Sequence, residues 1–555
     1  MRIFFRAIVS PWNQSYDPLG FWPASTLVAS LPIVVLFYLL AFRRVGAALS
    51  AAGGALAALL IAVLVFGMPV SLAGMSFVYG VGFGLVKIAW IVFSAVFLYD
   101  IAVATGAFEI MKDSIAAISG DRRLQALIIA FSFGAFIEGA AGFGAPVAIS
   151  AAFMVGLGFE PFYAAALCLI ANTAPVAWGA LGTPVHTLAA VTALPEADLN
   201  AMIGRILPFT SIIVPFWLVR TMVGWRETFA VLPAILVTGV FFAIPQFYWS
   251  NYQDANLVDI IAALVSLSAM VVLVRFWKPK ETWRFPHETV SAPKEASGTG
   301  AILRAWMPFV ILSVFVFLWG LPSVKKVLNV VTPVFPVPFL HLGVARAAPV
   351  VSGVVPEAAL FDFNWLSATG TGCFLAAIVS GLALGLSPRE LARVFVRTAH
   401  RMRMPLVAIA CMLGLGFVTR YSGIDAVLGL ACTRTGILYP FFGTMLGWLG
   451  VALTGSDTSS NALFGSLQRI TAEQLGFDPV LMAAANSAGG VMGKMVDAQS
   501  IVVATAATHQ VGNEGRIFRF VMWHSVALGS IVGLIVMAYA FLFPDLVPHG
   551  LTFPE

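Results

Sequence analysis

Four ionisable residues stand inside long apolar stretches of this chain, where each charge needs a reason to be present: Glu138, Asp457, Lys494 and Asp497. A charged side chain at the centre of a bilayer costs about 2.5–3.5 kcal/mol even on a lenient scale. Burial favours the uncharged form of a carboxyl, so Glu138 or Asp457 is suited to take up and release a proton. Lys494 is suited to pair with one of those carboxylates or with a substrate anion; the alternative is a static ion pair that only stabilises the local structure.

Most of these residues belong to a pattern that occurs twice. In each copy small and polar residues interrupt an apolar stretch, and an Ala-Asn dipeptide follows at a similar spacing. The first copy reads EGAAGFGAP at 138–146 and ends in ANTAP at 171–175; the second reads TGSDTSSN at 454–461 and ends in ANSAGG at 485–490. Interrupted hydrophobic segments at matching positions in two halves indicate the substrate site of a transporter. The pattern therefore predicts a carrier.

Hydrogen-bond donors gather around both interruptions. Half-helices that meet with their N-termini at mid-membrane present free N–H groups and positive dipole ends, which favour an anion such as a carboxylate. A helix cap or a contact between helices would explain any one of the neutral donors, but two matching copies favour a shared site. We predict that a small hydroxy acid is bound by Asn172, Thr173, Ser456, Thr458, Ser459, Asn461, Asn486, Ser487, Lys494 and Gln499.

The composition sets the class of protein. Hydrophobic residues make up 60% of the 555 positions and charged residues 10%, with a mean hydropathy of +0.94, whereas soluble globular chains carry about 25% charged residues. Apolar stretches long enough to span a bilayer recur along the whole chain. With the interrupted stretches they amount to roughly 12–14 transmembrane or re-entrant segments. We predict an all-α polytopic membrane protein.

The basic residues and the cysteines suggest no other partner. A net charge of +5 does not indicate nucleic-acid binding, because Lys and Arg concentrate in the cytoplasmic loops of membrane proteins. One helix face holds Arg389, Arg393, Arg397 and Arg401, and we expect it to be cytoplasmic rather than a specific site for anionic lipid. The four cysteines show no CxxC or Cys/His spacing, so neither a metal nor a disulfide is expected. No cofactor motif is expected either, since no βαβ unit surrounds the glycine-rich runs.

The interruptions also suggest how the chain is divided. We expect an N-terminal membrane half at 1–277, a polar linker at 278–300 and a C-terminal membrane half at 301–555. Non-helical backbone at membrane depth must line protein or a water-filled cavity. Each half is therefore expected to hold one re-entrant hairpin, at about 124–158 or 439–470, and one broken helix, at about 164–190 or 481–504. Carriers built from two inverted-topology repeats have this arrangement.

The sequence resembles the L-lactate permease family of bacterial inner membranes over almost its whole length. The resemblance rests on SFGAFIEGAAGFGAP at 132–146, NTAPV at 172–176, GWLG at 447–450, LTGSDTSSNALF at 453–464 and GGVMGKM at 489–495, with YDP at 16–18 and LGVAR at 342–346 also similar. It implies proton-coupled uptake of lactate, glycolate or related 2-hydroxy monocarboxylates across the cytoplasmic membrane, by elevator-type movement and without enzymatic activity. The implied partners are the substrate anion, protons and the lipid bilayer. A homo-oligomer is compatible with the resemblance.

Glu138, Asp457 and Lys494 match the family pattern, whereas three other residues depart from it. Asp497 replaces a Ser in an Ile-Ser-Pro run, His186 stands where apolar residues are usual, and Arg420 stands where Asn is usual. Together with Arg346 these are secondary candidates for the site. His186 has the intrinsic pKa that a proton relay needs, although a single histidine in a helix is more often a structural core residue.

Two alternative functions remain open from the residues. A sodium-coupled carboxylate carrier would have the same architecture, with unwound backbone carbonyls that bind Na⁺. Tyr99-Asp100 together with Gly455-Ser456-Asp457 also resembles the paired aspartates of intramembrane aspartyl proteases, which share a proton. The duplication has no role in that chemistry, so the protease is the remote alternative.

Overall fold

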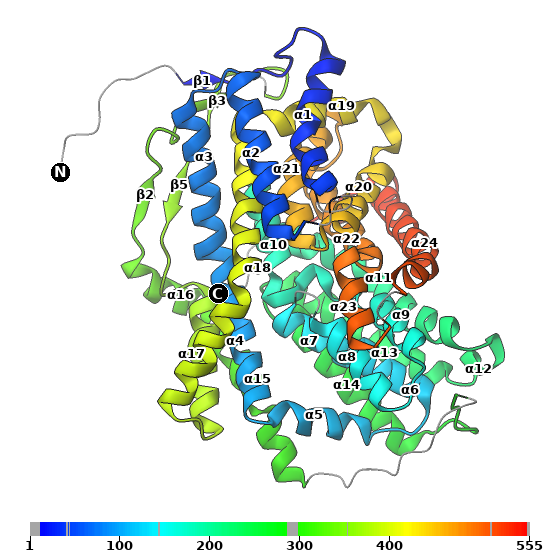
Figure 1. Ribbon diagram of the computed structural model, residues 1–555. Coiled ribbons are helices and arrows are strands. Elements are labelled where there is room, and N and C mark those ends of the chain that lie inside the picture. Colours follow the sequence, from blue (N-terminus) through cyan, green and yellow to red (C-terminus); the bar gives the residue numbers. More distant parts are fainter. Residues whose placement is uncertain are drawn as a thin grey trace.

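The computed structural model of the chain describes residues 11–39, 43, 45–142, 145–285, 298–351, 353–510 and 513–551. Within these ranges, 10 helical segments are long and apolar enough to cross a membrane, or 11 if one bent pair counts as a span. Three shorter apolar helices, Trp22–Phe37, Pro146–Gly156 and Thr369–Ala383, bring the apolar segments into the range that the sequence predicts. The chain is thus a helical multi-pass membrane protein (Figure 1).

The first half of the chain is helical from α1 to α14. Its elements are α1 (Trp22–Phe37), α2 (Ala47–Leu64), α3 (Val70–Phe83), η2 (Gly84–Ala89), α4 (Trp90–Ala104), α5 (Ala107–Ala116), α6 (Arg122–Gln125), η3 (Ala126–Phe133), α7 (Gly134–Ala141), α8 (Ala145–Gly156), α9 (Pro161–Ala171), η4 (Val176–Trp178), α10 (Gly179–Thr192), α11 (Glu196–Met222), α12 (Trp225–Phe229), α13 (Leu232–Tyr252) and α14 (Val258–Phe276). Much of the predicted linker, 286–297, lies outside the described residues.

The second half runs from α15 to the end of the described chain. Its helical elements are α15 (Thr299–Gly320), α16 (Pro322–Leu328), η5 (Asn329–Val331), α17 (Thr369–Ala383), α18 (Pro388–Ser422), α19 (Ile424–Cys432), η6 (Thr433–Leu438), α20 (Tyr439–Thr454), α21 (Asp457–Leu475), α22 (Pro479–Gly493), η7 (Lys494–Val496), α23 (Ala498–Ala507), α24 (Glu514–Phe541) and η8 (Pro544–Leu546).

Two small sheets, which the sequence does not predict, accompany the helices. β1 (Trp12–Asn13) pairs in parallel with β3 (Val344–Arg346), and β3 pairs antiparallel with β4 (Val355–Pro356). β2 (Val334–Pro336) and β5 (Leu360–Asp362) form a separate antiparallel pair. Strands of two or three residues are too short for an alternating hydrophobic pattern to be visible. The first sheet joins the start of the chain to the segment between α15 and α17, and the second lies within that segment.

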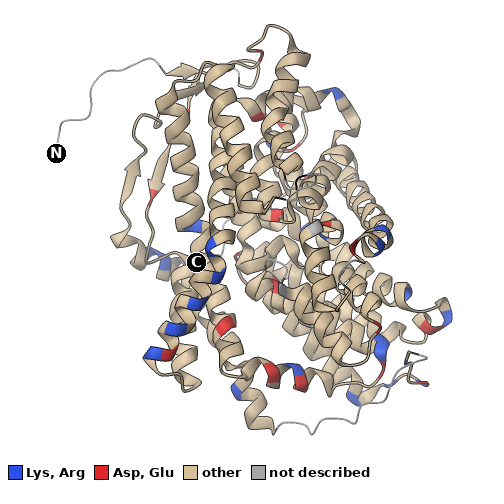
Figure 2. Ribbon diagram, viewed as in Figure 1, with Lys and Arg blue, Asp and Glu red and all other residues tan. Residues whose placement is uncertain are grey.

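The helices form two groups that lie side by side (Figure 1). In one group the long helix α18 packs along α2, α3 and α4, and α17 packs on α4 and α15. In the other, α11 packs on α13, α13 on α14, and α22 on α20 and α24. The basic face predicted on α18 is present as an exposed row of arginines near its start (Figure 2).

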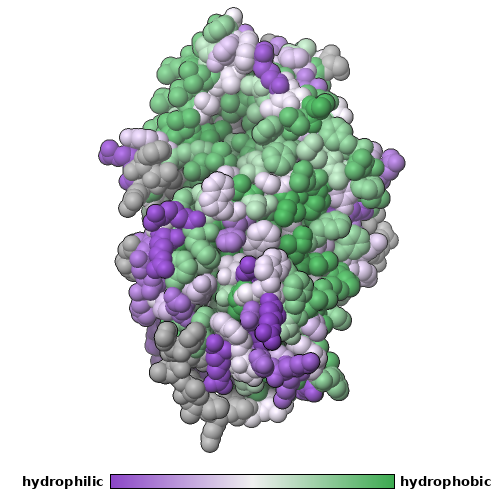
Figure 3. Space-filling model, turned by 90° about the vertical axis from the view of Figure 1, so that its right-hand side faces the viewer, coloured by the Kyte–Doolittle hydropathy of each residue, from purple (hydrophilic) through white to green (hydrophobic). Residues whose placement is uncertain are grey.

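The outer surface matches a lipid environment. Large apolar side chains are exposed on helices throughout the chain, including Trp523, Phe276 and Leu303. A soluble monomer rarely exposes apolar patches larger than a few hundred Å². The face seen in Figure 3 is largely apolar in its upper half and on its right, and becomes hydrophilic toward its lower end. We attribute the apolar zone to contact with the bilayer.

Glycines allow α20 and α22 to pack backbone against backbone. A Cβ atom at Gly489 would overlap the carbonyl oxygen of Thr444, and one at Gly447 would overlap that of Asn486. Small residues at helix contacts permit such close approach, which compensates for the lack of a hydrophobic driving force between helices in lipid. These contacts hold the two helices that contribute to the second hairpin and the second broken helix.

Gly489→Ala is therefore expected to destabilise the protein by about 1–3 kcal/mol or more, because the obstructing atom belongs to the backbone and cannot rotate away. Thermal unfolding in detergent would measure the loss. Gly515→Ala is the matched control, because a Cβ atom at Gly515 meets nothing within 4 Å, and it should leave the unfolding temperature unchanged or slightly raised. An unchanged unfolding temperature for Gly489→Ala would contradict the packing described.

Candidate functional site

Four breaks in helical structure meet around one cavity. The first lies at Gly142, where α7 ends before α8, and the second at Gly455 and Ser456 between α20 and α21. The third is the bend of 64° between α9 and the segment that contains α10, and the fourth is the short turn η7 between α22 and α23. The cavity is small, with a volume of about 30 Å³, where one water molecule needs roughly 10–15 Å³.

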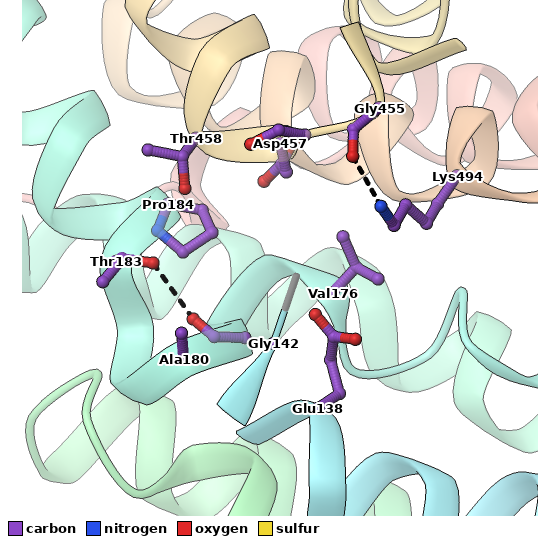
Figure 4. Close-up of a pocket in the computed structure, with 12 residues that line it drawn as sticks. Glu138, Gly142, Val176, Ala180, Thr183, Pro184, Gly455, Asp457, Thr458 and Lys494 are labelled. Carbon is purple, nitrogen blue, oxygen red and sulfur yellow. Dashed lines mark hydrogen bonds between the residues drawn. The ribbon is translucent and has the colours of Figure 1, made fainter. Parts of the chain in front are cut away.

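The lining comes from both halves of the chain (Figure 4). The first half supplies Glu138, Gly142, Val176, Gly179, Ala180, Thr183 and Pro184, and the second supplies Gly455, Ser456, Asp457, Thr458 and Lys494. In Figure 4 the Glu138 carboxyl points into the space from one side, and Asp457 and Lys494 lie across from it. One buried site thus joins segments that are far apart in sequence.

The backbone of the first broken helix is strained where it lines the cavity. Ala180 and Leu181 have φ values of 46° and 58°, in the left-handed region that residues with a Cβ atom rarely adopt. Such conformations cost about 1–3 kcal/mol each and persist only where the surroundings enforce them. A Cβ atom at Gly182 would lie 2.6 Å from the carbonyl oxygen of Ala255, so the loop before α14 presses directly on the break.

Asn200 on α11 supports the break from behind. Its side-chain oxygen accepts a hydrogen bond from Nε1 of Trp178 at 2.7 Å, and its amide nitrogen donates to the carbonyl oxygen of Ser250 at 2.9 Å. All three groups are buried. The side chain therefore fixes the position of Trp178, directly before the strained segment, relative to the end of α13.

Asn200→Ala is expected to lower stability by about 1–3 kcal/mol for each buried polar group that it leaves unpaired. Thermal unfolding in detergent would report this loss. Asn513→Ala is the control, since its hydrogen bond to Gln510 is exposed, and it should leave the unfolding temperature unchanged. Equal unfolding temperatures for the two variants would rule out the supporting role of Asn200.

Glu138 is buried near the end of α7 with little to stabilise a charge. Its side chain is 4% exposed and packs against Gly179, where a Cβ atom would overlap Oε1. Its Oε2 atom has no hydrogen-bond partner among the residues that the structure describes. The Asn172 amide lies close enough to interact with the carboxyl, yet neither its oxygen nor its nitrogen makes a hydrogen bond within the described chain. Both side chains therefore have unused hydrogen-bonding capacity at the cavity.

Asp457 begins α21 on the opposite side of the cavity. Its Oδ2 atom accepts hydrogen bonds from the Ser487 hydroxyl at 2.5 Å and the Asn461 amide at 3.3 Å. Oδ1 has no partner in the described part of the chain. Asn461 also donates to the carbonyl oxygen of Pro184 at 3.1 Å, which joins the second hairpin to the first broken helix. Asp457 is thus held in place through one oxygen and left unpaired at the other.

Lys494 supplies the positive charge of the cavity wall. Its ammonium donates to the carbonyl oxygen of Gly455 and lies 3.4 Å from Oδ2 of Asp497. The pairing with Glu138 or Asp457 that the sequence suggested is therefore wrong as a direct contact. Asp497 is nearer because the single turn η7 separates it from Lys494 by only three positions. Pairing with a substrate anion stays a prediction.

The other predicted binding residues divide into two sets. Ser456 and Thr458 line the cavity, and the Ser456 hydroxyl caps α21 by accepting from the Ser459 amide at 3.3 Å. The rest are absent from the lining. Thr173 donates to Ile170, Asn486 bridges Asn461 and Gln468, and Ser487 holds Asp457. Gln499 is exposed on α23, although its Oε1 atom would lie 3.3 Å from a Cβ atom at Gly455.

The secondary candidates His186, Arg346 and Arg420 have partners away from the cavity. His186 lies between Asn256 and Glu196, at 3.0 Å from each. Arg346 and Arg420 both bind the carboxylate of Glu357, Arg420 at 3.0 Å. Arg420 also donates to the carbonyl oxygen of Ala190 at 3.0 Å. The two arginines therefore tie β3 and the end of α18 to the end of α10.

The two aspartates that suggested a protease have separate partners. Asp100 accepts from the Thr398 hydroxyl at 2.5 Å and pairs with Arg401 at 2.7 Å, whereas Asp457 binds Ser487 and Asn461. An aspartyl protease needs two carboxyls that share one proton. The structure does not bring these two together.

Several lining residues escaped the sequence analysis. The lining residues that were not predicted as site residues are Gly142, Val176, Gly179, Ala180, Thr183, Pro184 and Gly455. Their side chains carry no ionisable or amide group that would indicate a binding site. Pro184 lies within the predicted broken helix, however, and a proline there could have been noticed as a helix interruption. Phe143 and Gly144 of the predicted hairpin turn lie outside the described residues.

Comparisons with known proteins agree on one family. A family model described as L-lactate permease matches residues 25–543. Glycolate permease GlcA of Escherichia coli (strain K12) is 44% identical over 97% of this chain and 99% of its own length. The L-lactate permeases of Salmonella typhimurium and Bacillus subtilis are 45% and 43% identical over 97% of this chain and 100% of their own lengths.

Proposed function

The chain belongs to the L-lactate permease family, and from this premise we propose that it carries L-lactate and related 2-hydroxy monocarboxylates, such as glycolate, across the bacterial cytoplasmic membrane together with protons. The observation behind this proposal is the cavity between Glu138 and the Asp457–Lys494 wall. It is small, its lining includes polar and ionisable side chains, and it is built from breaks in four helical segments, as expected for the site of a secondary transporter.

The charges around the cavity favour joint binding of an anion and protons. Lys494 already has Asp497 as a counter-ion. If Glu138 and Asp457 were also ionised, a carboxylate substrate would add another negative charge to a buried site with excess negative charge, and like charges repel strongly at low dielectric. Protonation of Glu138 or Asp457 removes that repulsion. In this mechanism the proton binds first or with the anion, and both leave together on the other side.

Recognition of the anion falls to Lys494 and the first turn of α21. The Lys494 ammonium can exchange its contact with Gly455 for a substrate carboxylate, and the hydroxyls of Ser456 and Thr458 are placed to bind the carboxylate or the 2-hydroxyl. The N-terminus of α21 adds backbone N–H groups and a positive dipole end.

We further propose that the two hairpin and broken-helix units are inverted repeats that move together as an elevator. The second group of helices, which contains both units, packs beside the long helices of the first group. An elevator mechanism requires a moving body that holds the whole site and a static body beside it. The same proposal is compatible with a homo-oligomer.

The deciding experiment is counterflow of labelled L-lactate in proteoliposomes, followed by uptake under an imposed pH gradient and, separately, an imposed sodium gradient. We expect counterflow and accumulation driven by the pH gradient. Absence of counterflow would contradict transport of lactate. Accumulation that follows sodium alone would replace the proton mechanism with the sodium-coupled one.

A further inference from the structure

A second buried acid, Asp259, lies directly behind the Glu138 side of the cavity. It belongs to the first turn of α14 and is 1% exposed. Neither of its carboxyl oxygens has a hydrogen-bond partner within the described ranges. An ionised carboxylate without a donor or counter-ion is costly to bury, so the side chain is held as a neutral acid. The surroundings of Asp259 therefore favour its neutral, protonated form.

Asp259 and Glu138 are coupled through the contact between α7 and α14. A Cβ atom at Gly139, the residue after Glu138, would lie 2.7 Å from Cβ of Asp259 and 3.2 Å from the backbone nitrogen of Ile260. Four elements pack against α14 here: α7, α10, α13 and η3. Among the described charged groups on them, Glu138 is the one that interacts electrostatically with Asp259. Ionisation of either acid therefore opposes ionisation of the other.

Titratable groups also connect this region with the surface. Glu196, with its side chain 37% exposed, binds His186 at 3.0 Å, and His186 contacts Asn256 at 3.0 Å. The half-buried Asp254 accepts from the Asn256 side chain at 2.7 Å. The loop that holds Asp254 and Asn256 leads straight into the first turn of α14. Asp254 and Asn256 thus stand five and three positions before Asp259 in the chain.

We propose that Asp259 is a second proton-binding residue, which exchanges its proton with Glu138 during transport. The Asp259 carboxylic acid gives its proton to the Glu138 carboxylate, and the Asp259 anion is then reprotonated from the His186 and Asp254 side. Each exchange transfers one proton and leaves the total charge of the pair unchanged. This assignment rests on the proposed proton-coupled transport and names a residue that supplies the proton.

Asp259→Asn tests the assignment, because asparagine keeps the shape and neutrality of the protonated acid but holds no transferable proton. In proteoliposomes we expect lactate counterflow within about twofold of wild type and accumulation driven by a pH gradient reduced at least about tenfold, a loss in the range of proton-transfer groups. Asp198→Asn is the matched control. Asp198 also lies in the first turn of a helix and is buried, but its oxygens accept from the amides of Gly550 and Leu551 at 3.0 and 2.8 Å. It should leave the ratio of accumulation to counterflow unchanged.

Three outcomes would overturn the assignment. One is full pH-driven accumulation by Asp259→Asn with an unchanged pH profile, which would make Asp259 a static acid. Another is equal loss of counterflow and accumulation in a variant of wild-type thermal stability, which would place Asp259 in substrate binding. The third concerns a second variant, Asp259→Ser, which replaces Asp259→Asn in the test if Asp259→Asn does not fold. Full pH-driven accumulation by Asp259→Ser would contradict the proposal. Failure of the wild type to counterflow lactate, or to respond to the pH gradient, would instead count against the proposed function itself.

Discussion

Replacing Lys494 with glutamine is expected to weaken lactate binding at least about 30-fold, because it removes the positive charge from the wall of the cavity and leaves Asp497 buried without its counter-ion. Removing one partner of a buried charge pair in a binding interface costs about 2–5 kcal/mol, which corresponds to roughly 30-fold to several thousand-fold in a dissociation constant. Binding to purified protein and counterflow in vesicles would both measure the effect. Lys326→Gln is the control, because Lys326 is exposed on α16 and away from the cavity.

A double variant separates anion binding from a static ion pair. Lys494→Gln with Asp497→Asn removes both charges at once, so the unpaired carboxylate that destabilises the single variant disappears. We expect thermal stability to return toward the wild-type value while lactate binding stays lost. If the double variant binds lactate like the wild type, Lys494 only stabilises the turn η7 and does not recognise the substrate.

Glu138→Gln and Asp457→Asn are expected to separate lactate exchange from its coupling to protons. Glutamine and asparagine preserve the size and neutrality of the protonated acids, so counterflow should persist in at least one of the two variants. Accumulation driven by a pH gradient should fall by roughly 10² or more in the variant that removes the proton carrier, since the bound proton can no longer be released. The measurement is the ratio of accumulation to counterflow as a function of external pH.

The two carboxyls are distinguishable by their surroundings. Oδ2 of Asp457 keeps two donors, Ser487 and Asn461, and the asparagine side-chain oxygen can accept from the same groups. Both acids have one unpartnered oxygen in the described structure, but Glu138 is not held by two side-chain donors as Asp457 is, so we expect Glu138→Gln to disturb local structure least and coupling most. Full proton-coupled accumulation in both variants would refute a role for either acid as the carrier.

Much of the membrane architecture follows from local pattern. Long apolar runs identify helices because a bilayer leaves few other ways to satisfy backbone hydrogen bonds. Interruptions within those runs, at Glu138–Pro146 and at Thr454–Asn461, mark where the helices break. The linker and the repeat relation between the halves stay predictions.

Contacts between residues far apart in the sequence could not be predicted from local patterns. Lys494 has several acidic neighbours in the fold, and only the geometry of η7 decides that Asp497 is the nearest. Asn461, Asn486 and Ser487 resemble ligands in sequence but bind other protein groups, because the packing of α21 on α22 turns them toward each other. Asp259 stands at the start of an ordinary apolar helix, and nothing nearby in sequence links it to Glu138.

The amino-acid sequence identifies a helical membrane carrier of one family, with buried charges at two helix interruptions. Those properties depend on residue type and on periodicity along one segment, which a sequence displays directly. The packing of the helices determines which interruptions share a cavity, which carboxyl oxygens lack partners and which acids lie side by side. These depend on how helices far apart in the chain pack together, and the opening pattern of Glu138, Asp457 and Lys494 becomes one site only through that packing.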